Sequence, residues 1–176
     1  MKDKPIKTFY TYKELEDWAG HYAEIKKSDH EDENKWLIFQ LAEERFMVSL
    51  DDLDEITPVQ NGIRLSSVNM NIMGLMNLRG DITVIADLGQ IIGIRQTPEP
   101  DKNQRILFIN DNNGKNVGFL VDRVEGISSL DNQQISIDVG SNKNDISQYI
   151  KFIAENNEKP VACIDIPAVL KETWNH

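Results

Sequence analysis

Short apolar runs separated by polar, turn-forming segments recur along the chain from residue 36 onwards. Their lengths and their content of Val, Ile and Phe are typical of strands, and the intervals between them are those of hairpin loops. The pattern predicts about nine or ten short strands, which favours closed or nearly closed β-barrels over a sheet of alternating strands and helices. The runs are 36–41, 46–50, 56–59, 72–78, 82–88, 105–110, 117–121 with its continuation 124–130, 135–139, 150–153 and 161–166.

Helices are predicted at the two ends of the chain. Thr11 and Glu14 have the spacing of a capping box, and apolar residues then recur at helical intervals. These apolar residues are Leu15, Trp18, Tyr22 and Ile25. We expect this helix either to pack on the body of its own domain or to bind a partner, and we expect residues 28–34 to form an acidic linker. Near the C-terminus, Pro167 suits the first turn of a short closing helix, Ala168–Trp174.

The stretch 72–88 is typical of a β-hairpin whose turn lies at residues 77–80. Gly80 permits the positive φ that a tight reversal needs. A single arginine, Arg79, then lies at the mouth of the hairpin among apolar residues, where a charge needs a carboxylate partner or a ligand. We hypothesise that Arg79 pairs with Glu55, which also has apolar neighbours. Removing one partner of a buried pair can cost about 3–5 kcal/mol.

Composition indicates an acidic, globular protein. Apolar residues make up 40% of the chain, and 29 acidic against 19 basic residues give a formal charge of −10. Such a surface repels phosphate backbones and no basic run is longer than Lys26-Lys27, so we expect no nucleic-acid partner. No apolar run has the length of a membrane span and the N-terminus lacks a signal-peptide core, which predicts a cytoplasmic protein without membrane insertion. We expect an N-terminal extension over 1–34 and a domain over 35–176.

Local patterns that would indicate an enzyme or a metal site are weak. The sequence has no phosphate-binding loop or dinucleotide fingerprint, and nothing in it supports a nucleophile–base pair. Its one cysteine, Cys163, lies in an apolar run, which is typical of a buried, inert thiol. Residues 111–114 look like the start of a calcium loop but lack the later oxygen ligands, and the acidic residues of 51–55 are typical of a solvated turn. We therefore expect no catalytic residue, metal or cofactor.

Several segments, in the same order along the chain, resemble the CheW-like adaptor family of bacterial chemosensory arrays. The most specific is 74–80, reading GLMNLRG, which is followed by an apolar strand. Residues 36–56, reading WLIFQLAEERFMVSLDDLDEI, look like the family's first hairpin and bridge. Residues 117–124, reading VGFLVDRV, resemble its Val-Gly-x-x-Val-Asp-x-Val strand pair. Residues 150–170 fit the closing hairpin and helix, so the resemblance covers about 35–172.

The resemblance implies a mainly β fold of two packed, five-stranded SH3-like barrels, without catalysis. It implies an adaptor that couples chemoreceptors to a CheA-type histidine kinase, at receptor arrays on the inner membrane. The receptor's cytoplasmic tip, a helical hairpin, would lie in a groove between the barrels, and the kinase's regulatory domain would dock at barrel ends. The implied protein-binding residues are Leu53 for receptor contact, Glu55 and Arg79 for coupling to receptor and kinase, and Asn77 and Leu78 in the same turn.

The sequence departs from the family pattern at several positions. Met47 replaces a small residue, Met73 stands where a lysine is common, and Val84 occupies a frequent proline position. Phe152 and Ala154 lie where a Gly-x-Gly is often found. Such departures suggest a divergent member, such as those that serve type IV pilus twitching systems, and they leave chemotaxis and twitching motility both open.

Two other functions stay open at this point. The chain could be a CheW-like regulatory protein that binds another partner through its N-terminal helix, or a small β-barrel enzyme or ligand-binding protein. A deep polar pocket with converging titratable groups would favour the enzyme or ligand-binding protein. A shallow apolar groove between barrels would favour an adaptor.

Overall fold

The structure, a computed structural model, describes most of the second of the two units into which the chain divides, Glu33–His176. The described residues are 35–59, 63–64, 71–94, 101–110, 116–130, 135–136 and 146–174. The predicted N-terminal helix and its acidic linker lie outside them.

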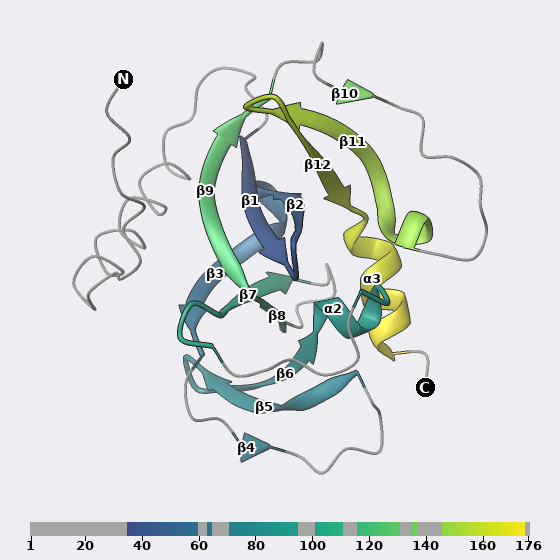
Figure 1. Cartoon of the computed structure of the whole chain (residues 1–176). Helices are drawn as coiled ribbons and strands as arrows, with labels where there is room; N and C mark the ends of the chain where they lie inside the picture. The colour runs from purple at the N-terminus through teal and green to yellow at the C-terminus, as the bar shows by residue number, and fades with distance from the viewer. Residues whose placement is uncertain are drawn as a thin grey trace. The chain divides into compact units, whose positions relative to one another are not determined.

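Two sheets contain all the strands of the described residues (Figure 1). The first has the order β10-β11-β12-β2-β1-β9 and consists of β1 (Lys35–Leu41), β2 (Glu44–Ser49), β9 (Arg123–Ser129), β10 (Ile135–Ser136), β11 (Ile150–Asn156) and β12 (Lys159–Ile164). The second has the order β3-β7-β8-β6-β5-β4 and consists of β3 (Leu53–Pro58), β4 (Ile63–Arg64), β5 (Ile72–Leu78), β6 (Asp81–Asp87), β7 (Arg105–Asn110) and β8 (Asn116–Val121). Each sheet has five longer strands and one strand of 2 residues, β10 or β4. The predicted mainly β fold of two five-stranded lobes is confirmed.

The second sheet is an insertion in the first. β1 pairs with β2 and β9, and β2 also pairs with β12, so segments from both ends of the domain build the first sheet. The second sheet uses only the chain from β3 to β8. The β12–β2 ladder is parallel and short: only Ala162 pairs with Phe46, and Cys163 with Met47. The hairpin of β11 and β12 is therefore paired with β2 through only a short ladder.

Each sheet encloses apolar side chains. In the first, Trp36 meets Phe152 edge-on with ring centroids 5.5 Å apart. The cluster around Trp36 also contains Ile38, Met47, Leu130, Ala154, Val161 and Cys163. In the second sheet the buried cluster consists of Met76, Ile85, Ile106, Phe108 and Leu120, with Met73 and Leu78 at its edge. Each lobe thus has an apolar core of its own, and the burial of this apolar surface is the main favourable term in its folding.

Tight turns with positive φ join three of the hairpins. The residues concerned are Ala42 (φ 53°), Arg79 (53°), Gly80 (98°), Asn157 (54°) and Glu158 (60°). Such turns match the right-handed twist of the strands they connect. The predicted loops at 42–45 and 156–160 are longer than the observed ones, because β2 already begins at Glu44 and β11 runs to Asn156.

Short helices connect several of the strands, and one of them, after residue 145, is not predicted by the sequence. A 3-10 helix, η1 (Leu50–Asp52), forms the acidic turn after β2, and a second, η3 (Ile146–Tyr149), precedes β11. Helix α2 (Leu88–Ile91) follows β6, and the closing helix α3 is Ile166–Trp174. Within the described residues, no helix combines the length and the apolar content that crossing a membrane requires.

Asp87 caps helix α2, and its replacement by alanine is expected to destabilise the domain. The residue is fully buried, and its Oδ1 accepts hydrogen bonds from the backbone N–H groups of Gly89 (2.9 Å) and Gln90 (3.4 Å). Alanine would leave these donors unpaired, which typically costs about 1–3 kcal/mol. Urea denaturation of Asp87→Ala and Asp87→Asn measures this, and asparagine, which also caps, should restore part of the loss. Equal stability of Asp87→Ala and the wild type would contradict the capping role.

Candidate functional site

Arg79 and Glu55 form the ion pair that the sequence predicts, but the pair is not buried. Nη2 of Arg79, in the β5–β6 turn, lies 2.8 Å from Oε2 of Glu55 in β3. The side chain of Arg79 is 75% exposed and that of Glu55 27%. The guanidinium of Arg79 and the carboxylate of Glu55 form an ion pair, but their geometry does not meet that of a hydrogen bond. Exposed pairs contribute about 0–1 kcal/mol, so the expectation of a buried pair costing several kcal/mol to break is wrong.

The backbone of Arg79 has an unusual conformation for an arginine. Its φ of 53° lies in the left-handed region, and Gly80 follows at 98°. The side chain of Asn77 stabilises the turn, since its Oδ1 accepts a hydrogen bond of 2.8 Å from the N–H of Gly80. Turns of this type favour Asn, Asp or Gly at the position of Arg79. The arginine therefore does not serve the stability of the turn, and strained positions of this kind cluster at functional sites.

The other predicted site residues differ in exposure. Asn77 ends β5 with an exposed side chain, and Leu78 beside it is half-buried at the edge of the core. Leu53, at the start of β3, is only 1% exposed. Leu53 therefore has no exposed side chain with which to contact a receptor. The structure thus brings together Glu55, Arg79, Asn77 and Leu78 around one hairpin, whereas Leu53 is buried at the start of β3.

Ile82 is an exposed apolar residue at the same hairpin that sequence reasoning missed. It is 76% exposed and pairs directly with Asn77 across the β5–β6 ladder, so the two side chains lie on the same outer face. The inner face of β6 begins with Thr83 and Ile85, which are 3% and 8% exposed. The sequence could not show this, because apolar residues occur on both faces of β6 and periodicity alone does not say which face points inward.

A shallow hollow lies where the chain of one lobe comes close to that of the other. Helix α2, which follows the second sheet, and η3, which leads into the first, line an open cavity of about 330 Å³. The lining residues are Ile91, Ile92, Gly93, Ile94, Ile146, Gln148 and Tyr149. Isoleucines share this lining with polar groups, such as those of Gln148 and Tyr149, so the hollow is a mixed polar and apolar surface.

Titratable groups do not converge in this hollow. Tyr149 is its one ionisable lining residue, and burial, with a smaller effect from the charge of Glu172, raises the pKa of the Tyr149 hydroxyl. The tyrosine is therefore uncharged at neutral pH. Among the described residues, no group of three or more His, Cys, Asp or Glu side chains is arranged to hold a metal ion.

Cys163 is buried in the first lobe, and we expect its thiol to be inert in the folded protein. It is 3% exposed, and burial raises its pKa to about 12. Because the thiolate is the reactive form, only a very small fraction reacts at neutral pH. A thiol-reactive chromophore at pH 7.5 should label the native protein at least about a hundredfold more slowly than the urea-unfolded protein. Similar labelling rates in the two states would contradict the burial of this thiol.

Comparison with known proteins identifies the family. The profile of the CheW-like domain matches residues 35–173. The chemotaxis protein CheW of Thermotoga maritima is 25% identical over 142 residues, which are 77% of this chain and 87% of the relative. That of Bacillus subtilis is 25% identical over 148 residues, 84% of this chain and 90% of the relative. The solved structure of the scaffolding protein TtCheW from Thermoanaerobacter tengcongensis has the same fold, with a TM-score of 0.69, 24% identity, and coverage of 81% of this chain and 90% of that chain. Because the family profile spans most of its length, this chain belongs to the CheW-like domain family.

Proposed function

We propose that this chain is a non-catalytic adaptor that couples chemoreceptors to the regulatory domain of a CheA-type histidine kinase. Membership of the CheW-like family and relatives that are chemotaxis proteins support this function. The adaptor would act in the cytoplasm, at receptor arrays on the inner membrane. The relatives favour chemotaxis, whereas departures such as Met47 and Val84 favour a twitching-motility system.

The observation that carries the proposal is the surface at the β5–β6 turn. Arg79 is held in a left-handed conformation and is 75% exposed, and Ile82 beside the turn is 76% exposed. An exposed arginine next to an exposed apolar side chain, on a β-hairpin, has the composition of a protein-binding hot spot. We infer that this surface, which we term the hairpin face (Glu55, Asn77, Arg79 and Ile82), contacts the kinase or the receptor.

The hollow between α2 and η3 would take the second partner. A receptor tip is a helical hairpin, and an amphipathic helix binds by placing its apolar side chains in an apolar groove. The isoleucines of the hollow offer apolar contacts to such a helix, and Gln148 offers a polar one. Separate surfaces for two partners are what an adaptor that bridges them requires.

Calorimetric titration of the full chain with each partner tests the proposal. The probes are the purified regulatory domain of the CheA-type kinase and the receptor's cytoplasmic tip, both from the same organism. We expect the wild type to bind both, and Ile82→Lys to weaken one of the two interactions at least about tenfold, which corresponds to roughly 1.4 kcal/mol. Because Ile82 is 76% exposed, this substitution should leave the unfolding midpoint unchanged.

Val59→Lys is the matched control, because Val59 is also an exposed apolar residue of the second lobe, at 47%, just beyond the end of β3. It should change neither affinity by more than about twofold if binding depends on the hairpin face. Failure of the wild type to bind either partner would overturn the proposed function. Binding that both lysine variants leave intact would overturn the assignment of the hairpin face.

A further inference from the structure

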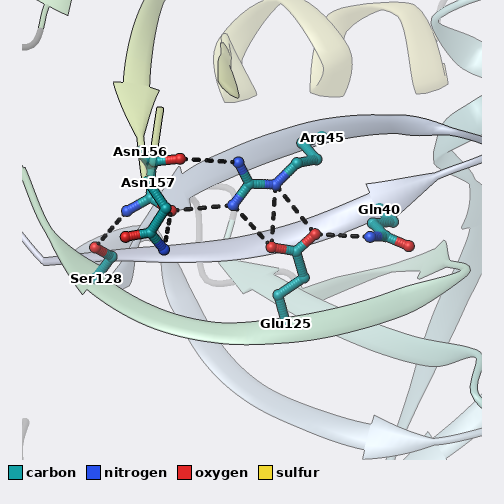
Figure 2. Close-up of polar contacts among 6 residues, drawn as sticks. All are labelled: Gln40, Arg45, Glu125, Ser128, Asn156 and Asn157. Atoms are coloured by element: carbon teal, nitrogen blue, oxygen red, sulfur yellow. Dashed lines mark hydrogen bonds and ion pairs between the residues drawn. The ribbon is translucent and has the colours of Figure 1, made fainter. Parts of the chain in front are cut away.

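Arg45 is the centre of a hydrogen-bond network in the first lobe (Figure 2). Its Nε donates to both carboxylate oxygens of Glu125 at 3.1 Å, and its Nη2 donates to Oε2 of Glu125 at 2.8 Å. Its Nη1 donates to the backbone oxygen of Asn156 at 3.1 Å, and Nη2 also donates to Oδ1 of Asn156 at 3.0 Å. Gln40 donates to Oε1 of Glu125 at 2.7 Å, and Nδ2 of Asn156 donates to Oγ of Ser128 at 2.8 Å.

The network joins strands that are not neighbours in the sheet. Arg45 is in β2, whose neighbours are β1 and β12. Its partner Glu125 belongs to β9, on the far side of β1, and Asn156 belongs to β11, on the far side of β12. The bond from Asn156 to Ser128 connects β11 to β9 directly, although these strands lie near opposite ends of the strand order. The network therefore closes the sheet upon itself, as a barrel requires.

The interactions of Arg45 are charged and partly exposed to solvent. The side chains of Arg45 and Glu125 are 15% and 26% exposed, and Asn156 is 7% exposed. Burial acts to raise the pKa of Glu125, but hydrogen bonds from Arg45 and Gln40, with the charges of Arg45 and Lys159, bring that pKa below its ordinary value. The carboxylate is thus ionised at neutral pH, and its bonds to Arg45 are charge-assisted, roughly twice as strong as neutral ones.

We propose that Arg45 acts as a clasp that keeps the hairpin of β11 and β12 closed against β9. The backbone ladder that attaches this hairpin to β2 pairs only two residues of each strand, so the side-chain network adds to the attachment that the apolar cluster around Trp36 provides. Asn156 is the last residue of β11, whereas η3 precedes the first residue of that strand, so the clasp acts at the end of the hairpin away from the hollow.

Hydrogen–deuterium exchange of the full chain, read by mass spectrometry, tests the clasp. We expect Arg45→Met to accelerate exchange about tenfold to a hundredfold in peptides from 123–129 and 150–164, since several charge-assisted bonds are lost. Peptides from 72–87, in the second sheet, should change by less than about twofold. Arg105→Met is the matched control, because the guanidinium of Arg105 donates to the nearby carbonyl oxygens of Lys102 and Gln104 in the other lobe.

Two results would overturn the clasp. Exchange that is unchanged in 150–164 would show that the network does not hold the hairpin. Equal acceleration in both sheets would show that Arg45 contributes only to global stability. Glu125→Gln preserves the shape of the side chain and removes its charge, so it is the variant with which to test the clasp if Arg45→Met does not fold. It should accelerate exchange in the same two segments by roughly threefold to tenfold, and an unchanged pattern in this variant would equally reject the proposal.

Discussion

Replacing Gly118 with alanine is expected to destabilise the protein by about 1–3 kcal/mol, and valine by more. Gly118 is in β8, paired with Ile85 of β6 on one side and with Phe108 of β7 on the other. A Cβ at this position would lie 2.5 Å from Cδ1 of Ile85, 2.7 Å from Cγ2 of Ile106 and 3.0 Å from Cε1 of Phe108. Ile106 and Phe108 are 2% and 0% exposed, so neither has space to move into without displacing the rest of the core.

The sign of the stability change shows whether the added Cβ clashes with the core, because glycine is otherwise less favourable than alanine in a strand. Without the clash, Gly118→Ala would stabilise the protein by about 0.4–1 kcal/mol through the unfolded state. Urea denaturation measures the loss, and Ile85→Val, which removes the nearest atom, should recover part of it in a double-mutant cycle. Gly80→Ala is a useful contrast, since no atom lies within 4 Å of its Cβ and only its φ of 98° is unfavourable. A Gly118→Ala protein as stable as the wild type would show that the core is looser than described.

The local elements could be predicted from the sequence because they depend on neighbours along the chain. The Asn-Leu-Arg-Gly turn, the strands on either side of it and the short helix after Asp87 all follow from turn chemistry and from alternation of apolar residues. The pairing of Arg79 with Glu55 could also be predicted, because both charges lie among apolar residues. Its exposure could not, since burial depends on what covers the hairpin.

The pairing of strands that are far apart in the chain could not be predicted from the sequence. Nothing local indicates that β1 pairs with β9 or that β2 pairs with β12, because strand propensity does not specify a partner. Arg45 shows the consequence. By sequence it belongs to a polar loop, yet the structure places it in a strand, with Glu125 80 residues away and Asn156 111 residues away in the chain. Leu53 likewise follows two aspartates of an acidic turn but lies in the core, at 1% exposure.

Arg79→Asn is expected to abolish most of the binding to one partner while leaving the fold intact. Asparagine adopts the left-handed conformation of this turn more readily than arginine, which should offset the loss of an exposed ion pair worth about 0–1 kcal/mol. The unfolding midpoint in urea should therefore be unchanged or slightly higher. Loss of an arginine hot spot costs about 2 kcal/mol or more, so the dissociation constant measured by calorimetry should rise at least about thirtyfold.

Glu55→Gln separates two ways in which the pair could act. If the guanidinium itself contacts the partner, this variant should bind almost as well as the wild type, because Arg79 keeps its exposed position in the turn. If the pair instead fixes the arginine for binding, Glu55→Gln should lose nearly as much affinity as Arg79→Asn. Unchanged binding of both partners by Arg79→Asn would mean that the left-handed arginine has no role in recognition. Binding at the hairpin face would then depend on Ile82 alone. The left-handed conformation of Arg79 would serve neither stability nor binding, and the fold would give no physical reason for it.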